Sequence, residues 1–370
     1  MQDNKTLKNN NNIIIDKPDN ILFIVIIFLL GFGIIMVYSA SMTTNIENLF
    51  LKQFISLGIS ILGLIVFSFL NHNILFKYNV YLLLISIILL ILVMLPPFGV
   101  VVGNARRWIN IGFIQFQPSE LAKLALIIYL SVTITNKGIK VKRFVTGFLP
   151  LLVVMISVFI LILIGPDFST ATLLLLTGLS IFYVGGIKFI YIVLSILFSL
   201  PLLLGLTLIT DYRLDRIKAF LNPFLYSDST GYQSIRFMKA LANGEVFGMG
   251  FGNGIQKHYI PYSFNDSIFS VIAEEVGFIG SLIVILFYLL FAYRGYLISF
   301  NAPTKSSRLL AFGLTTLITF QALINFSVVI GWIPITGITL PFISFGGTSL
   351  VITSISAGIL LNISKYKIKR

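Results

Sequence analysis

Three carboxylates gather in the stretch IPYSFNDSIFSVIAEEVG, which begins at Ile260 and leads into an apolar run. They are Asp266, Glu274 and Glu275, in a chain with only 13 acidic residues among 370. Carboxylates held near a bilayer lose hydration, which raises their pKa and suits a general base that works near neutral pH. Asp266 directly precedes the apolar run, so it could equally cap the helix that starts there. The local sequence leaves both roles open.

Two adjacent arginines, Arg106 and Arg107, precede Trp108. Tandem guanidinium groups can bind lipid headgroups at the membrane surface, or grip a substrate pyrophosphate through forked hydrogen bonds. Further on, the sequence PSELAK places Glu120 and Lys123 three residues apart, on one face of a predicted helix. These two side chains either form a local ion pair or leave Lys123 as an intramembrane cation that needs a buried partner.

The sequence DYRLDRIK carries Arg213 and Arg216, which share a face if the segment is helical. Asp211 and Asp215 would neutralise them on a solvated amphipathic helix. Together with the tandem arginines on the same predicted side of the membrane, they instead indicate a site for an anionic, lipid-linked substrate.

Helix-breaking residues crowd the sequence GWIPITGITLPFISFGGTSL, from Gly331 to Leu350. Non-helical backbone at membrane depth is tolerated only where protein buries it or where it faces a wet cavity. The segment is therefore either a re-entrant structural turn or a cavity wall with free backbone groups for a polar ligand. Ser344 and Thr348 are its candidate substrate-binding side chains.

These groups must be positioned by membrane helices, because 57% of the residues are hydrophobic and 11% are charged, against roughly a quarter charged in a soluble domain. The chain has no cysteine and two histidines, which excludes disulfides and a His-rich metal centre. Its net charge of +13 lies mostly in short loops and at the ends, so membrane topology explains it better than nucleic-acid binding. Residues 1–20 lack the apolar core of a cleavable signal peptide, so we expect the first span to be an uncleaved anchor.

We predict an all-α polytopic membrane protein with ten spans. Lysine and arginine concentrate in the C-terminal tail and in loops of one parity, whereas the short loops of the other parity carry only Lys52, Arg106 and Arg107. The positive-inside rule then places both termini in the cytoplasm. The predicted spans are residues 21–38, 54–70, 78–94, 118–134, 145–164, 170–184, 189–209, 267–293, 309–330 and 345–363.

The domain organisation follows from the spans. Residues 1–20 form a cytoplasmic tail, residues 21–363 the membrane domain, and residues 364–370 a basic cytoplasmic tail. One long segment, residues 211–266, lies on the outer side between spans seven and eight. Its sequence GEVFGMGFGNG is aromatic and punctuated by glycine, so we predict an ordered extracytoplasmic loop with one or two short helices.

A series of motifs resembles the SEDS family, which includes FtsW, RodA and SpoVE. The residues of the motifs MVYSAS (36–41) and RRWINIG (106–112) resemble those of FtsW more closely than those of RodA. The matching segments follow the family order over nearly the whole chain: MVYSAS at 36–41, ARRWINIG and FQPSELAKLAL within 105–126, PDFSTA at 166–171, YRLDRI and FLNP within 212–223, GYQ at 231–233, FGMGFGNGIQKHYIP at 247–261, AEEVG at 273–277 and PITGITLPFISFGGTSL at 334–350.

The resemblance implies a peptidoglycan glycosyltransferase that polymerises lipid II on the outer face of the bacterial cytoplasmic (inner) membrane. It also implies work with a class B penicillin-binding protein, a transpeptidase, and with other division or elongation proteins. The donor is a glycan on polyprenyl pyrophosphate, the acceptor is lipid II, and a general base assists one inverting step. The sequence contains no dedicated metal cage, so Mg²⁺ or Mn²⁺ enters only as an ion that would offset charge on the leaving pyrophosphate.

The essential aspartate of the family ends a Pro-x-x-x-x-Asp element, which here runs from Pro261 to Asp266. The family's glutamate and lysine match Glu120 and Lys123. Glu274 and Glu275 are interpreted as partners for buried cations such as Lys123. The predicted substrate-binding residues are Arg106, Arg107, Glu120, Lys123, Arg213, Arg216, Gln233, Lys257, Glu274, Glu275, Ser344 and Thr348.

The polar surroundings of the aspartate depart from the family pattern, which usually reads Pro-Glu-x-His-Thr-Asp-Phe. Here the usual Glu, His, Thr and Phe are replaced by Tyr262, Phe264, Asn265 and Ser267. In the same way, other polar residues of the family give way to Gly165, Arg236 and Phe237. Arg236 and Phe237 stand where a Gln-Ser pair usually follows GYQ.

Two alternatives from other functional classes fit the same membrane layout. A protein with broken helices and intramembrane charges could transport lipid II across the bilayer, although no inverted repeat is visible. The other alternative is a non-catalytic scaffold that recruits division proteins.

Overall fold

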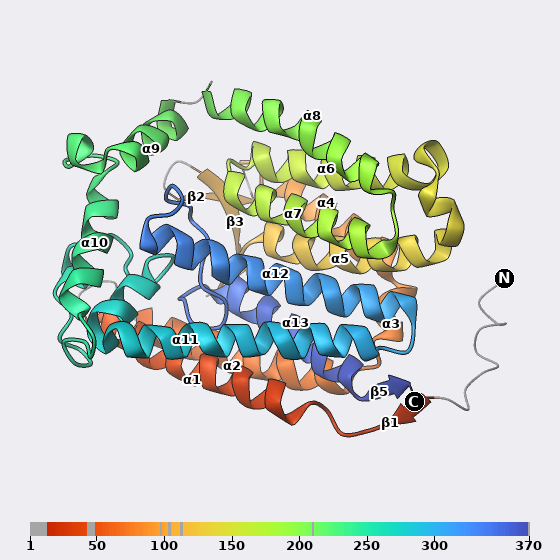
Figure 1. Cartoon of the computed structure of the whole chain (residues 1–370), viewed down its shortest axis with the longest axis horizontal. Coiled ribbons are helices and arrows are strands. Elements are labelled where there is room, and N and C mark those ends of the chain that lie inside the picture. Colours follow the sequence, from red (N-terminus) through yellow and green to blue (C-terminus); the bar gives the residue numbers. More distant parts are fainter. Residues whose placement is uncertain are drawn as a thin grey trace.

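The computed structural model describes residues 13–42, 49–96, 98–102, 105–111, 114–208 and 211–368. Long helices run side by side through most of the molecule (Figure 1). The fold is a multi-pass helical membrane bundle, as predicted. Each predicted span coincides with a helix: α1 (Asn20–Ser41), α2 (Leu49–Phe69), α4 (Asn79–Leu92), α5 (Pro118–Lys137), α6 (Leu149–Ile164), α7 (Phe168–Gly185), α8 (Phe189–Leu208), α11 (Ile268–Asn301), α12 (Lys305–Ile330) and α13 (Gly347–Ser364).

Within the described residues, eight helices are long and apolar enough to cross a membrane. The other two, α4 and the Phe189–Ser199 part of α8, are apolar but shorter. Because a bilayer core of about 30 Å needs about 20 apolar residues, the count of ten crossings stays a prediction.

Local sequence explains where several helices begin. The carboxylate of Asp19 accepts a hydrogen bond from the backbone N–H of Leu22 at 2.9 Å and caps α1. The carboxylate of Asp167 caps α7 by the same contact with Thr170, at 3.2 Å. Proline occupies the first position of α5, where its missing N–H would have had no helical partner.

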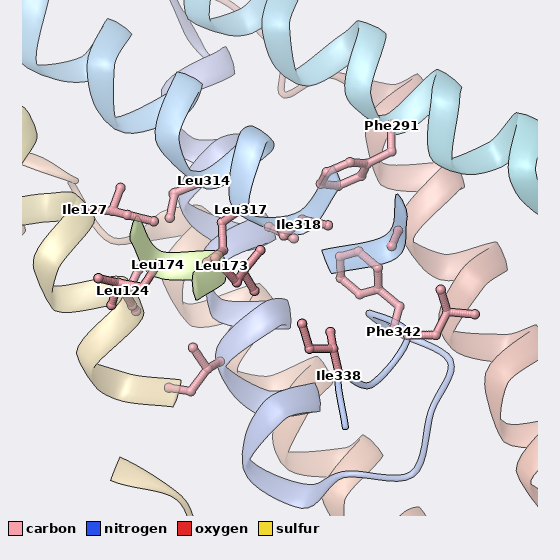
Figure 2. Packing of buried hydrophobic residues seen from close by; sticks show 14 of the residues in the cluster. Leu124, Ile127, Leu173, Leu174, Phe291, Leu314, Leu317, Ile318, Ile338 and Phe342 are labelled. Carbon is pink, nitrogen blue, oxygen red and sulfur yellow. The ribbon is translucent and has the colours of Figure 1, made fainter. Parts of the chain in front are cut away.

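The core lies where α5, α7, α11 and α12 meet the segment between α12 and α13 (Figure 2). Leucine and isoleucine side chains of α5, α7 and α12 interlock there, while the rings of Phe291 and Phe342 pack with centroids 5.6 Å apart. The helices α12 and α13 bury most of their side chains, so they form the centre around which the more lipid-exposed helices pack.

The chain between α12 and α13, residues 331–346, is non-helical and enters the bundle. A side chain on Gly33, in the middle of α1, would place its Cβ 2.7 Å from the backbone of Ile343. From the middle of α11, the Tyr288 hydroxyl donates to the carbonyl of Pro341. Protein therefore buries residues 340–344, which confirms the re-entrant turn.

Shorter elements cover the ends of the bundle. The helices α9 (Asp211–Leu221) and α10 (Tyr232–Gly244), with the short turns η5 (Pro223–Tyr226) and η6 (Gln256–His258), lie across one end (Figure 1). They confirm the predicted short helices. A three-stranded sheet that we did not predict joins α4 to α5: β2 (Gly99–Val102), β3 (Ala105–Ile111) and β4 (Ile114–Phe116). At the opposite end lie α3 (Asn73–Lys77) and the turns η3 (Gly138–Lys142) and η4 (Phe144–Phe148).

The two ends of the described chain meet in a small β-ribbon at that opposite end (Figure 1). Strand β1 (Ile13–Ile15) pairs antiparallel with β5 (Tyr366–Ile368). The backbone N–H of Asp16 donates to the carbonyl of Lys365 at 2.8 Å, and the Asp16 carboxylate pairs with Lys367 at 2.7 Å. We call this pairing the terminal clasp. It places the first and last described segments on the same side of the bundle.

Candidate active site

Asp266 lies half-buried just before α11, at the end of the bundle that α9 and α10 cover. The helix starts at Ile268, and Ser267 occupies the capping position without a side-chain cap. The interpretation of Asp266 as a helix cap is therefore wrong. Its carboxylate instead accepts a long hydrogen bond from the Ser267 hydroxyl, at 3.4 Å, which leaves acceptor capacity for another partner.

Burial raises the pKa of Asp266 from 3.8 to about 6. Hydrogen bonds and the positive charge of Arg216 oppose this rise without cancelling it. The guanidinium of Arg216 is held by a bond to the carbonyl of Ile335, at 2.8 Å. Asp266 is thus a carboxylate whose proton affinity suits a general base near neutral pH, with a fixed positive charge nearby.

Three other elements fix the backbone around Asp266. The side-chain amide of Asn325, on α12, donates to the carbonyls of Asp266 at 2.7 Å and Ile338 at 2.8 Å. The hydroxyl of Ser344 donates to the carbonyl of Asn265 at 2.6 Å. From α10, the amide of Gln233 donates to the Ser267 hydroxyl at 2.9 Å. The structure therefore brings Gln233, Arg216 and Ser344 together with Asp266, from segments far apart in the sequence.

Lys123 forms the local ion pair that its spacing indicated, with 2.9 Å between its ammonium and Glu120. Both side chains are buried, and the ammonium also lies 3.5 Å from the amide oxygen of Gln321. Glu275 does pair with a buried cation, as expected, but Lys123 is the wrong example, because Glu120 one turn away already supplies its negative charge. Gln321 lies one turn from Asn325 on α12, so the same helix contacts both the ion pair and the backbone of Asp266.

Glu275 pairs with a different buried cation, Lys257, at 2.7 Å. The hydroxyl of Ser39, on α1, donates to the same carboxylate oxygen at 2.6 Å. Glu274 accepts the backbone N–H of Gln256 at 2.9 Å. Both glutamates and Lys257 are almost fully buried. Their charges are therefore stabilised by protein partners in place of water.

A break in α11 explains how these acids are accommodated. Gly277 has φ +69°, and a Cβ there would lie 2.3 Å from the backbone of Gly248. The backbone N–H groups freed by the break donate to the glycine-rich loop, from Phe278 to Glu245 at 3.0 Å and from Ile279 to Val246 at 3.1 Å. Residues 278–301 alone are about 36 Å long, enough to cross a bilayer. The acids thus lie in a short piece ahead of the spanning part.

Arg106 and Arg107 lie on β3 and line a small hollow together with Ser119 and Asp167. The Arg107 guanidinium donates to the carbonyls of Gly165, at 3.0 Å, and Pro166. The N-termini of α5 and α7 both reach this hollow, through Ser119 and Asp167. The Ser119 hydroxyl is buried without a hydrogen-bond partner among the described residues. The Asp167 carboxylate already caps the N-terminus of α7, so the N-terminus of α5 and the two guanidinium groups are what favour an incoming anion.

Two predicted site residues lie elsewhere. Thr348, at the start of α13, accepts the backbone N–H of Gln117 at 3.1 Å and donates to the carbonyl of Gln115 at 2.7 Å, so it joins α13 to β4. Arg213 belongs to α9, and its side chain lies outside the described part of the structure. In the described ranges, no three His, Asp or Glu side chains lie close enough together to hold a metal ion.

Sequence reasoning missed Gln321 and Asn325. The available signal was the pair of amide side chains four residues apart in a predicted span without charged residues, because polar groups within a membrane helix usually face protein partners.

Comparison with known proteins identifies the fold and its relatives. The family model described as "Cell cycle protein", for FtsW, RodA and SpoVE, matches residues 20–369. The chain is 36% identical to stage V sporulation protein E of Bacillus subtilis over 95% of this chain and 98% of that protein. It is 37% identical to a probable peptidoglycan glycosyltransferase FtsW of Geobacter sulfurreducens, over 95% of this chain and 96% of that protein.

Two solved structures share the architecture. One was reported as "Structural coordination of polymerization and crosslinking by a peptidoglycan synthase complex"; it matches with a TM-score of 0.79 and 28% identity, over 94% of this chain and 97% of that chain. The other is the rod shape determining protein RodA of Thermus thermophilus, with a TM-score of 0.71 and 27% identity, over 94% of this chain and 96% of that chain.

Proposed function

Because this chain belongs to the family of FtsW, RodA and SpoVE, we propose that it is a peptidoglycan glycosyltransferase. It polymerises lipid II at the outer face of the bacterial cytoplasmic membrane, for cell division or elongation. The observation that carries this proposal is Asp266, a half-buried carboxylate of raised pKa that shares the outer end of the bundle with Arg216.

The reaction is a single displacement. The 4-hydroxyl of the GlcNAc unit of lipid II attacks C1 of the MurNAc at the end of the donor glycan. Asp266 takes the hydroxyl proton while the new C1–O bond forms and the bond from C1 to the pyrophosphate oxygen breaks. The α-linked polyprenyl pyrophosphate leaves with the bonding electrons, and the product is a β-1,4 linkage. The step therefore inverts C1, and Asp266 then releases its proton to solvent.

The leaving pyrophosphate needs positive charge at the same end of the molecule. The hollow lined by Arg106 and Arg107 supports such a site, because the N-terminus of α5 reaches it and the Ser119 hydroxyl there has no described partner. The buried pair of Glu120 and Lys123 acts through α12 as a positioning group for the backbone at Asp266.

The partners follow from the same family. The protein works with a class B penicillin-binding protein that cross-links the new strands, and with other division or elongation proteins. A solved structural neighbour reported for a peptidoglycan synthase complex supports this. Both termini lie in the cytoplasm, in accord with the positive charge of the C-terminal tail.

The test uses the full chain, reconstituted with its transpeptidase and labelled lipid II, with products separated on a gel. We expect wild type to form polymer and Asp266→Asn to lose at least about 100-fold in rate, the lower end of what a general base contributes. Asp228→Asn, an exposed acid in the same outer loop, is the matched control and should retain polymerisation.

Polymer formed by Asp266→Asn would contradict the assignment of the base. Movement of lipid II across the bilayer by wild type without polymer would indicate a transporter. If wild type neither moves nor polymerises lipid II, the scaffold alternative is favoured.

A further inference from the structure

Arg236, on α10, is held between two aromatic rings. Its guanidinium carbon lies 4.7 Å from the ring centroid of Tyr232 and 4.4 Å from that of Tyr259. One of its nitrogens donates to the side-chain oxygen of Gln256 at 3.3 Å. Cations attract the faces of aromatic rings, so the two tyrosines and Gln256 fix the plane and the direction of this guanidinium.

The support for Arg236 extends into the buried acids. Gln256 is itself buried, and its backbone N–H donates to both carboxylate oxygens of Glu274, at 2.9 and 3.1 Å. Asn243, at the end of α10, donates to the same carboxylate at 2.9 Å. Glu274 thereby ties both the helix that carries Arg236 and the loop that carries Gln256 to α11, which makes the guanidinium a pre-organised donor.

Gln233 connects the helix that carries Arg236 to Asp266. Gln233 lies three residues earlier on the same face of α10 and donates to the Ser267 hydroxyl, which donates in turn to Asp266. Side chains three residues apart on a helix are neighbours, with about 5–6 Å between their Cβ atoms. A group bound by Arg236 would therefore lie within one substrate's reach of Asp266.

The guanidinium carries five N–H donors, and Gln256 is its one hydrogen-bond acceptor among the described residues. No described carboxylate forms an ion pair with it. Such a half-buried guanidinium, held in one direction and without a described counter-ion, favours an incoming oxyanion. Its planar fork matches carboxylate and phosphate groups, and the side chain loses little rotamer freedom on binding.

We infer that Arg236 binds an oxyanion of the lipid-linked substrate, either a carboxylate of its peptide or an oxygen of its pyrophosphate. This inference rests on the proposed function and names a further affinity-determining residue for it. The site is built from Tyr232, Tyr259 and Gln256 around Arg236, and Gln233 links the same helix to Asp266 through Ser267.

The experiment measures binding rather than turnover. The full chain carrying Asp266→Asn is reconstituted in lipid nanodiscs, and lipid II is titrated. We expect Arg236→Gln to weaken binding at least about tenfold, as loss of a charge-assisted contact does, with Arg236→Lys intermediate because the planar fork is lost but the charge is kept. Lys239→Gln removes the same charge from an exposed position one turn further along α10 and should change binding less than twofold.

A second ligand identifies the oxyanion. Lipid-linked disaccharide pyrophosphate without the peptide is titrated against the same variants. If Arg236→Gln weakens only the peptide-bearing ligand, the contact is to a carboxylate; if it weakens both equally, the contact is to the pyrophosphate. Unchanged affinity for both ligands would overturn the inference.

The salt dependence of binding distinguishes a direct contact between Arg236 and the ligand from a purely structural role of Arg236. The wild-type affinity should fall with ionic strength more steeply than that of Arg236→Gln, because a charge contact is screened. Parallel salt dependences, with equal loss for Arg236→Gln and Arg236→Lys, would mean that the variants only loosen the loop and would also overturn the inference. A wild-type chain that binds lipid II but forms no polymer would contradict the proposed function while leaving this site intact.

Discussion

Two opposing influences act on the half-buried carboxyl group of Asp266. Burial raises its proton affinity, while Arg216 keeps a positive charge close enough to oppose the rise. The result is a base that is largely ionised at pH 7 yet strong enough to take a proton from a hydroxyl as it attacks. Asn325, Gln233 and Ser344 act on the neighbouring backbone and hydroxyl groups rather than on the carboxylate itself.

The pH dependence of polymerisation tests this charge state. Because the base must be ionised and its pKa is about 6, the rate should be near its plateau above pH 7 and fall about tenfold per pH unit well below 6. Single-turnover rates from pH 5 to 8 at saturating lipid II measure this, and substrate binding over the same range is the control. A rate independent of pH down to 5 would exclude Asp266 as a base of raised pKa.

The Lys257–Glu275 pair makes a stability prediction. Glu275→Gln leaves the buried ammonium of Lys257 without its carboxylate, and breaking a buried pair in this way costs about 3–5 kcal/mol. The double variant Glu275→Gln, Lys257→Met removes both charges and should recover most of that loss. Thermal unfolding in detergent compares the three proteins, and a double variant no more stable than the single one would refute the charge argument.

At the scale of single residues, sequence reasoning succeeded where partners are close along the chain. Glu120 and Lys123 are three positions apart, so helix geometry alone predicts their contact. Glu275 and Lys257 are separated by a glycine-rich loop whose path depends on the break at Gly277, and no local rule gives that path. Asp266 could be singled out by type and resemblance, whereas its cap role could be excluded only by geometry.

At the scale of elements, the re-entrant segment depends on a close approach by α1. Gly33→Ala would push a methyl group to 2.7 Å from the backbone of Ile343 and Phe342, so α1 or the segment must shift. We expect a loss of stability of about 1–3 kcal/mol, as for other overpacked sites, and weaker substrate binding because residues 335–344 hold Arg216 and the backbone beside Asp266.

Gly31→Ala is the matched control for this prediction. Gly31 lies on the same helix with nothing within 4 Å of its added Cβ, so the substitution should be neutral or slightly stabilising through helix propensity. Thermal unfolding and lipid II binding are measured for both variants. Equal behaviour of the two would show that the close contact does not matter.

The membrane helices could be predicted because each one is a long apolar run in the sequence. The sheet from Gly99 to Phe116 could not be predicted in this way. Its strands are short, and a hydropathy profile does not show which segments pair through hydrogen bonds. Likewise, α11 is predicted as one helix, and only the positive φ of Gly277 divides it into a short piece that carries Glu274 and Glu275 and a long apolar piece.

At the scale of the whole molecule, the terminal clasp makes the topology testable. Because β1 and β5 pair, the chain must cross the membrane an even number of times, in accord with ten predicted spans. Reporter fusions after residue 370 and within residues 211–266 should report opposite sides, with the C-terminal fusion in the cytoplasm. A C-terminal reporter on the outer side would contradict the orientation that the positive-inside rule predicts. It would also contradict the predicted order of the spans.

The clasp also has a consequence for biosynthesis. Its ion pair joins residues 351 positions apart, so β1 leaves the ribosome long before its partner strand exists. At about 5–20 residues per second, the first strand waits on the order of 20–70 s for β5. During that interval the N-terminal segment has no strand partner, and closure of the ribbon can only follow insertion of the last helix. The clasp therefore forms only after α13, the helix that precedes β5, has been made.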